Sequence, residues 1–428
     1  MIHANFPRYT DFDPLVPVFC ATPGRPACIH RFFDTSAISP SGRYLAVFQM
    51  PFENRAPLPG EKGAVCLIDL ETGDDRIIAE TCGWEPQLGA NINWGGSDHE
   101  LFYNDVDTRT WQPFAWKADP VSGRTERLHG TVYHASPDGR WLISANLSTM
   151  RRTQPGYGVA LPEDQIRRNV GRVEDDGFYI TDTSTGKSNL LASIRDLLDR
   201  ANPQVNIGNS ENQEIYGFHC KFNPQGDRLM LSLRWYPKNR HSFWGRVRNR
   251  AKRLATNYQP IRFAWITYGL NDGQVNCAVG PEQWQKGGHH ATWFPDGQRI
   301  SMNLNIDGDG LRFVQVNADG SDLKKICTQV EGSGHPTVHV GGKFLLTDTY
   351  PYERTAFGDG TVPLRWINLE TEQEQVAVRV NTRQPQHLKV LRVDAHPAWD
   401  RSWRYVVFNA YLGGSRRVMI ADMKDLID

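Results

Sequence analysis

The clearest feature of the chain is a pattern of apolar and polar positions that recurs along nearly its whole length. In each copy an apolar residue is followed by a tight turn and then by alternating apolar and polar positions, which is typical of a β-hairpin. The seven copies, of which the second, sixth and seventh are degenerate, occupy residues 38–48, 94–104, 133–144, 222–233, 293–304, 338–348 and 399–409. Such recurrence predicts a repeat architecture.

Most copies are followed by a second pair of strands around another turn, as in "GAVCLIDLETGDDRIIA" and "FVQVNADGSDLKKIC". Seven four-stranded units with few helices predict an all-β fold, a single seven-bladed β-propeller over residues 1–428. Two tandem β domains are the alternative, but the even distribution of the repeat favours one propeller. We expect the N-terminal segment, about 1–27, to close the last blade, with "LVPVFC" at 15–20 as its outer strand.

Long insertions interrupt the spacing in blades 3 and 4. They lie at about residues 147–176, 190–215 and 236–258, and the second contains "ASIRDLLDRAN", the clearest helical candidate. Insertions on a rigid scaffold are where binding and catalytic residues concentrate. We therefore expect function to involve these segments.

Counting back from each turn reveals a histidine register. The position six residues before the turn holds His219 in blade 4, His290 in blade 5, His335 in blade 6 and His396 in blade 7. Blades 1 to 3 have Thr35, Asn91 and Val132 there. The position three residues before the turn is apolar in every blade, which supports the alignment: Ile38, Trp94, Ala135, Phe222, Trp293, Val338 and Trp399.

The first strand of each propeller blade lines the central channel, so the four histidines are expected to face a common space. Imidazole suits manganese and zinc and suits calcium poorly, and these three divalent ions are the candidate cofactors. The alternative is structural repetition, in which each histidine caps a strand or holds ordered water. His289 and His339 flank the arc as weaker candidates.

Charge and composition narrow the possible partners. Lys+Arg and Asp+Glu balance at 48 each, which does not favour nucleic acid. No run of 18 apolar residues predicts a membrane span, and no signal segment opens the chain. We expect a cytoplasmic protein as the sequence stands, or a secreted or periplasmic one if a signal peptide has been removed. The oligomeric state is not indicated.

Local charge is concentrated in the insertions. Residues 236–258 carry seven basic residues and no acid, with Phe243 and Trp244 among them, and the blade 3 insertion adds five arginines around Tyr157. Arginine pairs with carboxylates in a bidentate manner, so an acidic saccharide fits, as does another polyanion. A solvated loop or a surface that docks another protomer remains the alternative.

Four segments resemble the seven-bladed propeller polysaccharide lyases, a group that includes oligogalacturonate lyase, ulvan lyase and rhamnose–glucuronate lyases. They are "HRFFDTSAISPSGRYLAVF", "GHHATWFPDGQRISMNL", "SGHPTVHVGGKFLLTDTYP" and "AHPAWDRSWRYVVFNA", and the resemblance spans about 28–425. It implies cleavage of an acidic oligo- or polysaccharide beside a uronic acid by β-elimination. Such a reaction needs a neutralised carboxylate and a base that accepts the C5 proton.

The resemblance also implies roles for individual residues. His290 and His335 resemble the metal ligands of oligogalacturonate lyase, and His219 and His396 extend that set. The catalytic candidates are His30, which resembles a histidine of the rhamnose–glucuronate enzymes, and Tyr157, Arg172 and Arg234. The substrate-binding candidates are Asn91, Asn93, Arg151, Trp244, Arg246 and His289. Asn91 and Asn93 stand where an ulvan lyase would have a catalytic histidine, which argues against that chemistry.

Two other functions stay open. An α-L-rhamnosidase-like glycoside hydrolase could use the same scaffold, and a non-catalytic propeller of the TolB type could bind acidic glycans or proteins. The sequence contains no GxSxG, Walker or HExxH motif.

Overall fold

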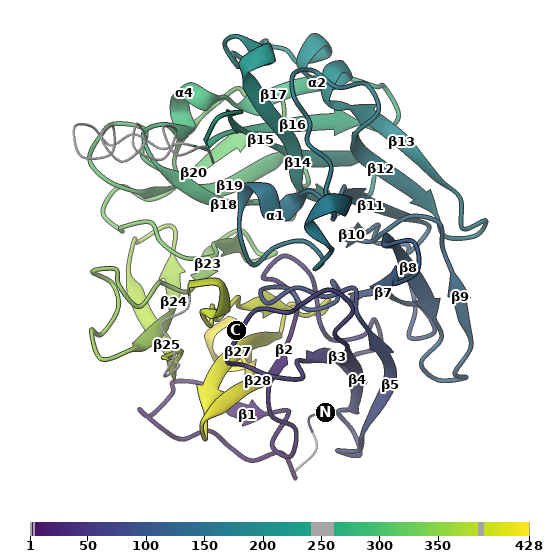
Figure 1. Ribbon diagram of the computed structural model, residues 1–428. Helices are drawn as coiled ribbons and strands as arrows, with labels where there is room; N and C mark the ends of the chain where they lie inside the picture. The colour runs from purple at the N-terminus through teal and green to yellow at the C-terminus, as the bar shows by residue number, and fades with distance from the viewer. Residues whose placement is uncertain (1, 3–4, 241–260, 384–388, 428) are drawn as a thin grey trace.

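The structure, a computed structural model, describes the chain except for residues 1, 3–4, 241–260, 384–388 and 428. Its strands form seven antiparallel sheets of four strands each, and Figure 1 shows these sheets arranged in a ring. The all-β, seven-bladed propeller predicted from the repeat is therefore confirmed.

Each of the first six blades is built from four strands that are consecutive in the sequence. Blade 1 consists of β2 (Cys28–Ile29), β3 (Tyr44–Gln49), β4 (Gly63–Asp69) and β5 (Asp75–Thr81). Blade 2 consists of β6 (Asn93–Trp94), β7 (Leu101–Asp107), β8 (Gln112–Ala118) and β9 (Thr125–Arg127). Blade 3 consists of β10 (His134–Ala135), β11 (Trp141–Ala145), β12 (Gly177–Asp182) and β13 (Ser188–Ser193).

Blades 4 to 6 follow the same order from the channel outward. Blade 4 consists of β14 (Gln213–Phe222), β15 (Arg228–Pro237), β16 (Arg262–Gly269) and β17 (Val275–Val279). Blade 5 consists of β18 (Gly288–Trp293), β19 (Arg299–Leu304), β20 (Arg312–Asn317) and β21 (Lys324–Lys325). Blade 6 consists of β22 (Thr337–Val338), β23 (Phe344–Thr347), β24 (Thr361–Asn368) and β25 (Glu374–Asn381).

Blade 7 joins the two ends of the chain. Its strands β26 (Ala398–Trp399), β27 (Tyr405–Leu412) and β28 (Ser415–Asp422) are completed by β1 (Val18–Cys20), which pairs antiparallel to β28 with Phe19 opposite Ile420. Figure 1 shows β1 beside β28. The ring is therefore closed by hydrogen bonds and packing between the two ends of the chain.

The recurrent turn folds locally through its aspartate and glycine. In blade 5 the Asp296 carboxylate accepts hydrogen bonds from the backbone N–H groups of Gln298 (2.8 Å) and Arg299 (3.0 Å), and Gly297 has a φ of 66°. Glycine adopts this left-handed conformation without the steric cost that a Cβ brings. The Pro-Asp-Gly signal thus sets the hairpin that joins the two inner strands of the blade.

Blade 1 departs from the pattern of the other blades. After β2, residues 30–37 leave the sheet, and pairing with β3 resumes only at the bridge between Ile38 and Leu45. Phe32 and Phe33, within this excursion, are each only 1% exposed and contact histidines of other blades. A segment of blade 1 therefore occupies part of the channel, which the repeat alone did not predict.

The helices of the described residues are short, and all but the last lie between strands. They are α1 (Met150–Thr153), α2 (Ile194–Arg200), α4 (Pro281–Trp284) and α5 (Lys424–Ile427), with 3₁₀ turns η1 (Glu163–Gln165), η2 (Ser210–Asn212) and η3 (Lys389–Leu391). The helix α2 matches the helical candidate of the second insertion and begins with a capping box between Ser193 and Asp196. None of the helices in the described part of the chain has the length and apolar character needed to cross a membrane.

Candidate functional site

The four register histidines converge on one aromatic ring, that of Phe32. The distances from its centroid to the imidazole centroids are 5.4 Å for His219, 6.3 Å for His290, 5.6 Å for His335 and 4.7 Å for His396. The histidines come from the inner strands of blades 4 and 5 and from the segments that lead into those of blades 6 and 7. We call this part of the channel the histidine end.

The register position has an unusual backbone in three blades. His290, His396 and Asn91 have φ values of 55°, 48° and 51°, and the pairing of β18 with β19 shifts between His289 and Thr292. A non-glycine residue in this region costs roughly 1–2 kcal/mol. In blade 5 this conformation coincides with the bulge that interrupts the sheet beside the channel.

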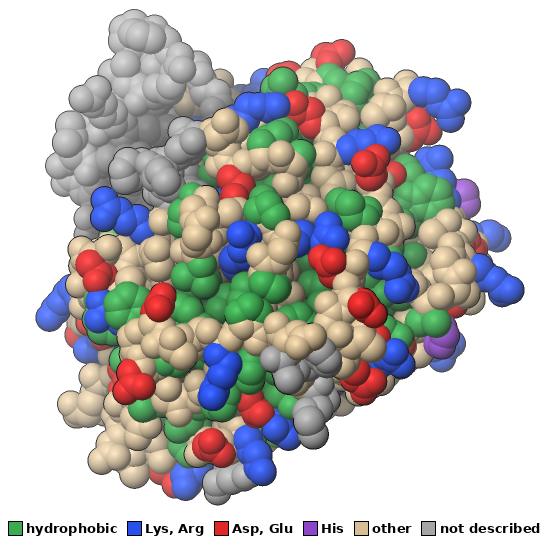
Figure 2. Space-filling view, turned by 90° about the horizontal axis from the view of Figure 1, so that it is seen from below, with side chains coloured by type: hydrophobic (Ala, Val, Ile, Leu, Met, Phe, Trp, Pro, Cys, Tyr) green, Lys and Arg blue, Asp and Glu red, His purple; other side chains and the backbone are tan. Residues whose placement is uncertain are grey.

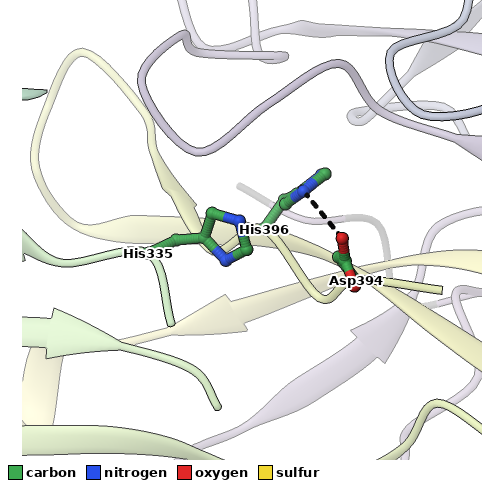
Figure 3. Close-up of side chains that lie close together, drawn as sticks. All are labelled: His335, Asp394 and His396. Atoms are coloured by element: carbon green, nitrogen blue, oxygen red, sulfur yellow. Dashed lines mark ion pairs between the residues drawn. The ribbon is translucent and has the colours of Figure 1, made fainter. Parts of the chain in front are cut away.

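Among the described residues, His335, His396 and Asp394 form a cluster of potential metal ligands, drawn in Figure 3. One ligand atom from each residue lies within 4.8 Å of the others, and His396 Nε2 is 3.7 Å from Asp394 Oδ2. All three residues are at least nine-tenths buried. His290 stacks on His335 with 3.8 Å between ring centroids, which adds a third imidazole beside the cluster.

Asp348 holds the imidazole of His335 and the backbone of His396. Its Oδ1 accepts hydrogen bonds from both the backbone N–H and Nδ1 of His335, each 2.8 Å long, and its Oδ2 accepts one from the His396 backbone N–H (3.2 Å). The proton on His335 Nδ1 leaves the Nε2 lone pair free. A carboxylate behind an imidazole is the usual arrangement for orienting a histidine toward a metal.

Gly334 permits this close contact. A Cβ at this position would lie 2.0 Å from the Asp348 backbone oxygen, and the residue has a φ of 64°. Its carbonyl oxygen accepts a hydrogen bond from His290 Nδ1 (2.7 Å), and His290 Nε2 in turn faces the hydroxyl of Tyr350 at 3.2 Å. Because Nδ1 donates to Gly334, His290 Nε2 is the nitrogen that accepts a hydrogen bond from the Tyr350 hydroxyl.

These residues fit a divalent cation. Within the described chain, His335 Nε2 and His396 Nε2 are buried and find no hydrogen-bond partner, and an unpaired buried polar atom is costly. Imidazole nitrogens with one carboxylate suit manganese or zinc better than calcium. Burial lowers the pKa of His290 and His396 well below the usual range, so both are neutral and able to act as ligands at neutral pH.

A cation and a phenol adjoin this cluster. Arg392 Nε lies 2.8 Å from Asp394 Oδ2, and its guanidinium also hydrogen-bonds the Tyr157 hydroxyl. Burial acts to lower the pKa of Arg392, but Asp394 and Tyr157 outweigh it and raise that pKa. Arg392 is thus permanently charged at this end of the channel. Burial raises the pKa of Tyr157, so its phenol keeps its proton.

His219 and Tyr157 lie together on another side of Phe32. Their ring centroids are 5.7 Å apart, and His219 packs between Phe218 (4.1 Å) and Tyr133 (5.3 Å). Burial lowers the pKa of His219 well below its usual range, and its Nε2 has no hydrogen-bond partner among the described residues. A neutral imidazole with a free nitrogen can accept a proton.

Glu85 is a residue that the sequence analysis missed. It is 1% exposed, one of its carboxylate oxygens accepts a hydrogen bond from the Gly158 backbone N–H, and burial raises its pKa to about 8. Glu85 therefore carries a proton at neutral pH next to the Tyr157 loop. No motif surrounds it, so only burial could have identified it.

The channel also contains a buried group of charged side chains. Asp34 Oδ2 lies 2.6 Å from Lys221 Nζ, and Asp34 Oδ1 lies 2.9 Å from Arg31 Nη1, with every side chain at most 2% exposed. Burial acts to raise the pKa of Asp34, but Lys221 and Arg31 hold it far below the usual range. This group anchors the blade 1 excursion to blade 4.

Two other catalytic candidates lie near the histidines. His30 is 1% exposed and lies 6.5 Å from His396 between ring centroids. The guanidinium carbon of Arg234 lies 3.3 Å from the centroid of the Phe218 ring, and the guanidinium donates a hydrogen bond to Gln154 Oε1 (2.6 Å). Burial lowers the pKa of Arg234 to about 9.

Arg172 and Arg151 have other surroundings. Arg172 forms its ion pair with Asp199 of α2, and half-buried Arg151 donates to the Leu161 carbonyl oxygen (3.5 Å). Neither makes a contact with the histidines in the described structure. Arg151 instead lines a separate cavity together with Arg152, Arg168 and Lys238.

The remaining substrate-binding candidates differ in position. His289 Nδ1 lies 2.9 Å from His290 Nδ1 and 3.1 Å from Asn303 Nδ2. Asn93 is buried and bonds the Asn91 carbonyl oxygen and the Ala135 N–H, so it connects blade 2 to blade 3. Trp244 and Arg246 lie outside the described residues.

Comparison with known proteins supports the fold. No protein-family model and no curated protein matches the sequence. Among solved structures, an oligogalacturonate lyase in complex with manganese has a TM-score of 0.62 and 14% identity, over 98% of this chain and 96% of that one. An oligogalacturonate lyase from Vibrio parahaemolyticus has a TM-score of 0.61 and 14% identity, over 99% and 97%. The resemblance to propeller lyases is thus confirmed at the level of the fold.

Proposed function

We propose that this protein is a polysaccharide or oligosaccharide lyase that cleaves the bond beside a uronic acid by β-elimination. The observation that carries the proposal is the convergence of four histidines from successive blades next to Asp394, Arg392 and Tyr157. The similarity in fold to a manganese complex of oligogalacturonate lyase supports it.

The reaction begins with removal of the C5 proton of the uronate. That proton becomes acidic only when the charge of the adjacent carboxylate is neutralised. Arg392 is a permanent cation in this part of the channel, and its planar guanidinium can pair with a carboxylate in a bidentate manner. We assign Arg392, which was not among the catalytic candidates from the sequence, to the substrate carboxylate.

The proton acceptor must be unprotonated and free to form a new bond. His219 meets both conditions, because burial keeps its imidazole neutral and its Nε2 is unbonded within the described chain. Tyr157, beside His219 and bonded to Arg392, keeps a phenolic proton that it can donate to the departing oxygen at C4. The C5–H bond and the C4–O bond break, and a C4=C5 double bond forms.

A divalent cation would be held by His290, His335, His396 and Asp394. When bound, it would act as a Lewis acid that adds to the neutralisation of the uronate carboxylate. Asp348 would hold the His335 imidazole with Nε2 directed to the ion.

A glycoside hydrolase is the second candidate, favoured by Glu85. A carboxyl group that is protonated at neutral pH can act as a general acid on a glycosidic oxygen. Hydrolysis would release a saturated sugar, whereas elimination leaves a conjugated double bond that absorbs ultraviolet light.

The test is incubation with galacturonate- and glucuronate-containing oligosaccharides while both ultraviolet absorbance and new reducing ends are measured. We expect the two signals to rise together, and Arg392→Met to lower kcat/KM by about 10²–10³-fold. The matched control is Arg172→Gln, which removes an arginine paired with Asp199 and should retain activity. Reducing ends without absorbance would replace the lyase by the hydrolase, and the absence of both signals would contradict both proposals.

A further inference from the structure

The inner strands carry a second set of polar residues beyond the histidines. Four residues before the turn, blades 2 to 6 have Asn93, His134, Lys221, Thr292 and Thr337. All five line a cavity of about 320 Å³ that extends to the hairpin turns, where Pro137, Pro224 and Pro295 also border it. We call this region the turn end of the channel. Its volume is at the lower limit of ligand pockets, which span about 300–1,000 Å³.

The cavity is separate from the histidine cluster. Phe33 lines it and also lies 5.1 Å from the His335 centroid, so this ring forms a wall between the two ends. The ion pair of Asp34 with Lys221 contributes to the same boundary. A ligand at the turn end therefore reaches none of the four histidines directly.

Aromatic side chains supply much of the lining. They are Trp94, Trp293, Trp399, Trp403, Phe33 and Phe222. Rigid aromatic surface with a few polar groups is typical of small-molecule sites. It suits a ligand with an apolar face, and the C–H face of a sugar ring is such a surface.

Two buried hydrogen-bond donors of the lining have no partner among the described residues, Trp399 Nε1 and Thr337 Oγ1. Trp399 is 6% exposed and Thr337 is 8% exposed, so bulk water is largely excluded from both. An indole N–H can only donate, and the threonine hydroxyl can donate. Unmatched buried donors indicate a ligand that offers oxygen acceptors.

A cation at the rim indicates the charge of that ligand. Arg401 reaches from blade 7 across the opening and donates to the carbonyl oxygens of Gly95 (2.6 Å) and Pro137 (3.5 Å). Within the described chain, no carboxylate lies within ion-pair distance of the Arg401 guanidinium. The carboxylate of Asp98, whose charge acts to raise the pKa of Arg401, accepts hydrogen bonds from Ser41. Arg401 is therefore positioned to receive an anionic group.

We propose that the turn end binds a single sugar acid, with its carboxylate at Arg401 and its ring among the tryptophans. The donors of Trp399 and Thr337 take ring or hydroxyl oxygens, and Asp34 on the cavity wall accepts from a hydroxyl. This site does not depend on the lyase function, because it shares no catalytic group with the histidine end.

Isothermal titration calorimetry with methyl β-D-glucuronide tests the proposal, with methyl β-D-glucoside as the neutral match. Neither compound has a glycosidic bond at C4, so elimination does not consume them. We expect saturable binding of the glucuronide at one site, at least about ten-fold weaker in Arg401→Gln and weakened also in Thr337→Val. Arg404→Gln is the matched control, because Arg404 is paired with Asp422 in the same blade and does not line the cavity.

His335→Ala distinguishes the two ends of the channel. Binding should be unchanged in this variant, whatever happens to cleavage. Loss of binding in His335→Ala with retention in Arg401→Gln would place the sugar at the histidine end and overturn the proposal. Equal affinity for glucuronide and glucoside would overturn the assignment of a sugar acid. If neither compound binds saturably, the turn end holds water only and the proposal is wrong.

Discussion

Replacing Glu85 with glutamine is expected to remove a pH-dependent loss of stability. Burial raises the pKa of this carboxyl to about 8 from an ordinary value of 4.5. The folded chain therefore holds the proton more tightly than the unfolded chain does. The contribution of this tighter proton binding to the free energy of unfolding is complete below pH 4.5 and declines as the pH rises towards about 8.

The magnitude follows from the interval of about 3.5 pH units, at about 1.4 kcal/mol per unit, which gives about 5 kcal/mol. About 1 kcal/mol of this is already lost at about pH 5, so about 4 kcal/mol remains to be lost between pH 5 and pH 9. A glutamine at this position has no proton to lose, and its amide oxygen can still accept from the Gly158 N–H. Arg31, whose charge favours the carboxylate, acts against the effect of burial and is already included in that pKa.

The assay is urea unfolding followed by tryptophan fluorescence for wild type and Glu85→Gln across that pH range. The informative quantity is the difference between the two free energies of unfolding, because other titrating groups cancel in it. We expect the variant to gain about 4 kcal/mol relative to wild type. The exposed Glu126→Gln on β9 serves as the control and should show a constant difference. A difference for Glu85→Gln that stays constant within about 1 kcal/mol would refute a protonated Glu85.

Two further predictions concern the metal cluster and the buried charges. After incubation with manganese and gel filtration, the wild type should retain one ion per chain, and His335→Ala should lose it. A variant at an exposed histidine, His129→Ala, should keep the ion. Retention of the ion in all three proteins would contradict the assigned ligands. Asp34→Ala should lower the free energy of unfolding by about 3–5 kcal/mol because Lys221 and Arg31 stay buried without their counter-charge, and an additional Lys221→Met should recover part of that loss. Equal stabilities for the single and double variants would argue against this ion pair.

Much of the fold was predictable because it depends on local patterns. Turns such as Pro-Asp-Gly and the alternation that follows them specify hairpins, and seven hairpins distributed along nearly the whole chain specify a propeller. The proximity of four histidines was predictable for the same reason, because equivalent strand positions face the same axis: His219, His290, His335 and His396. The prediction needed only the turn as a reference point.

The other parts of the site lie where periodicity ends. Arg392 and Asp394 are in an irregular segment before β26, and the blade 1 excursion that contains Phe32 follows no strand pattern. Glu85 is unremarkable in the sequence, and its raised pKa comes from burial in the folded chain. The arginines of the blade 3 insertion looked like one basic patch, yet Arg168 and Arg172 are paired with Glu214 and Asp199, which are distant in sequence.

The proposed reaction is elimination beside a uronic acid at the histidine end. The most direct test is a mass spectrum of the products formed from an acidic oligosaccharide in water enriched in a heavy oxygen isotope. We expect a new unsaturated end that is lighter by one water than a hydrolysis product and contains no heavy oxygen. Heavy oxygen in the newly formed ends, with full product mass, would contradict it and identify hydrolysis instead.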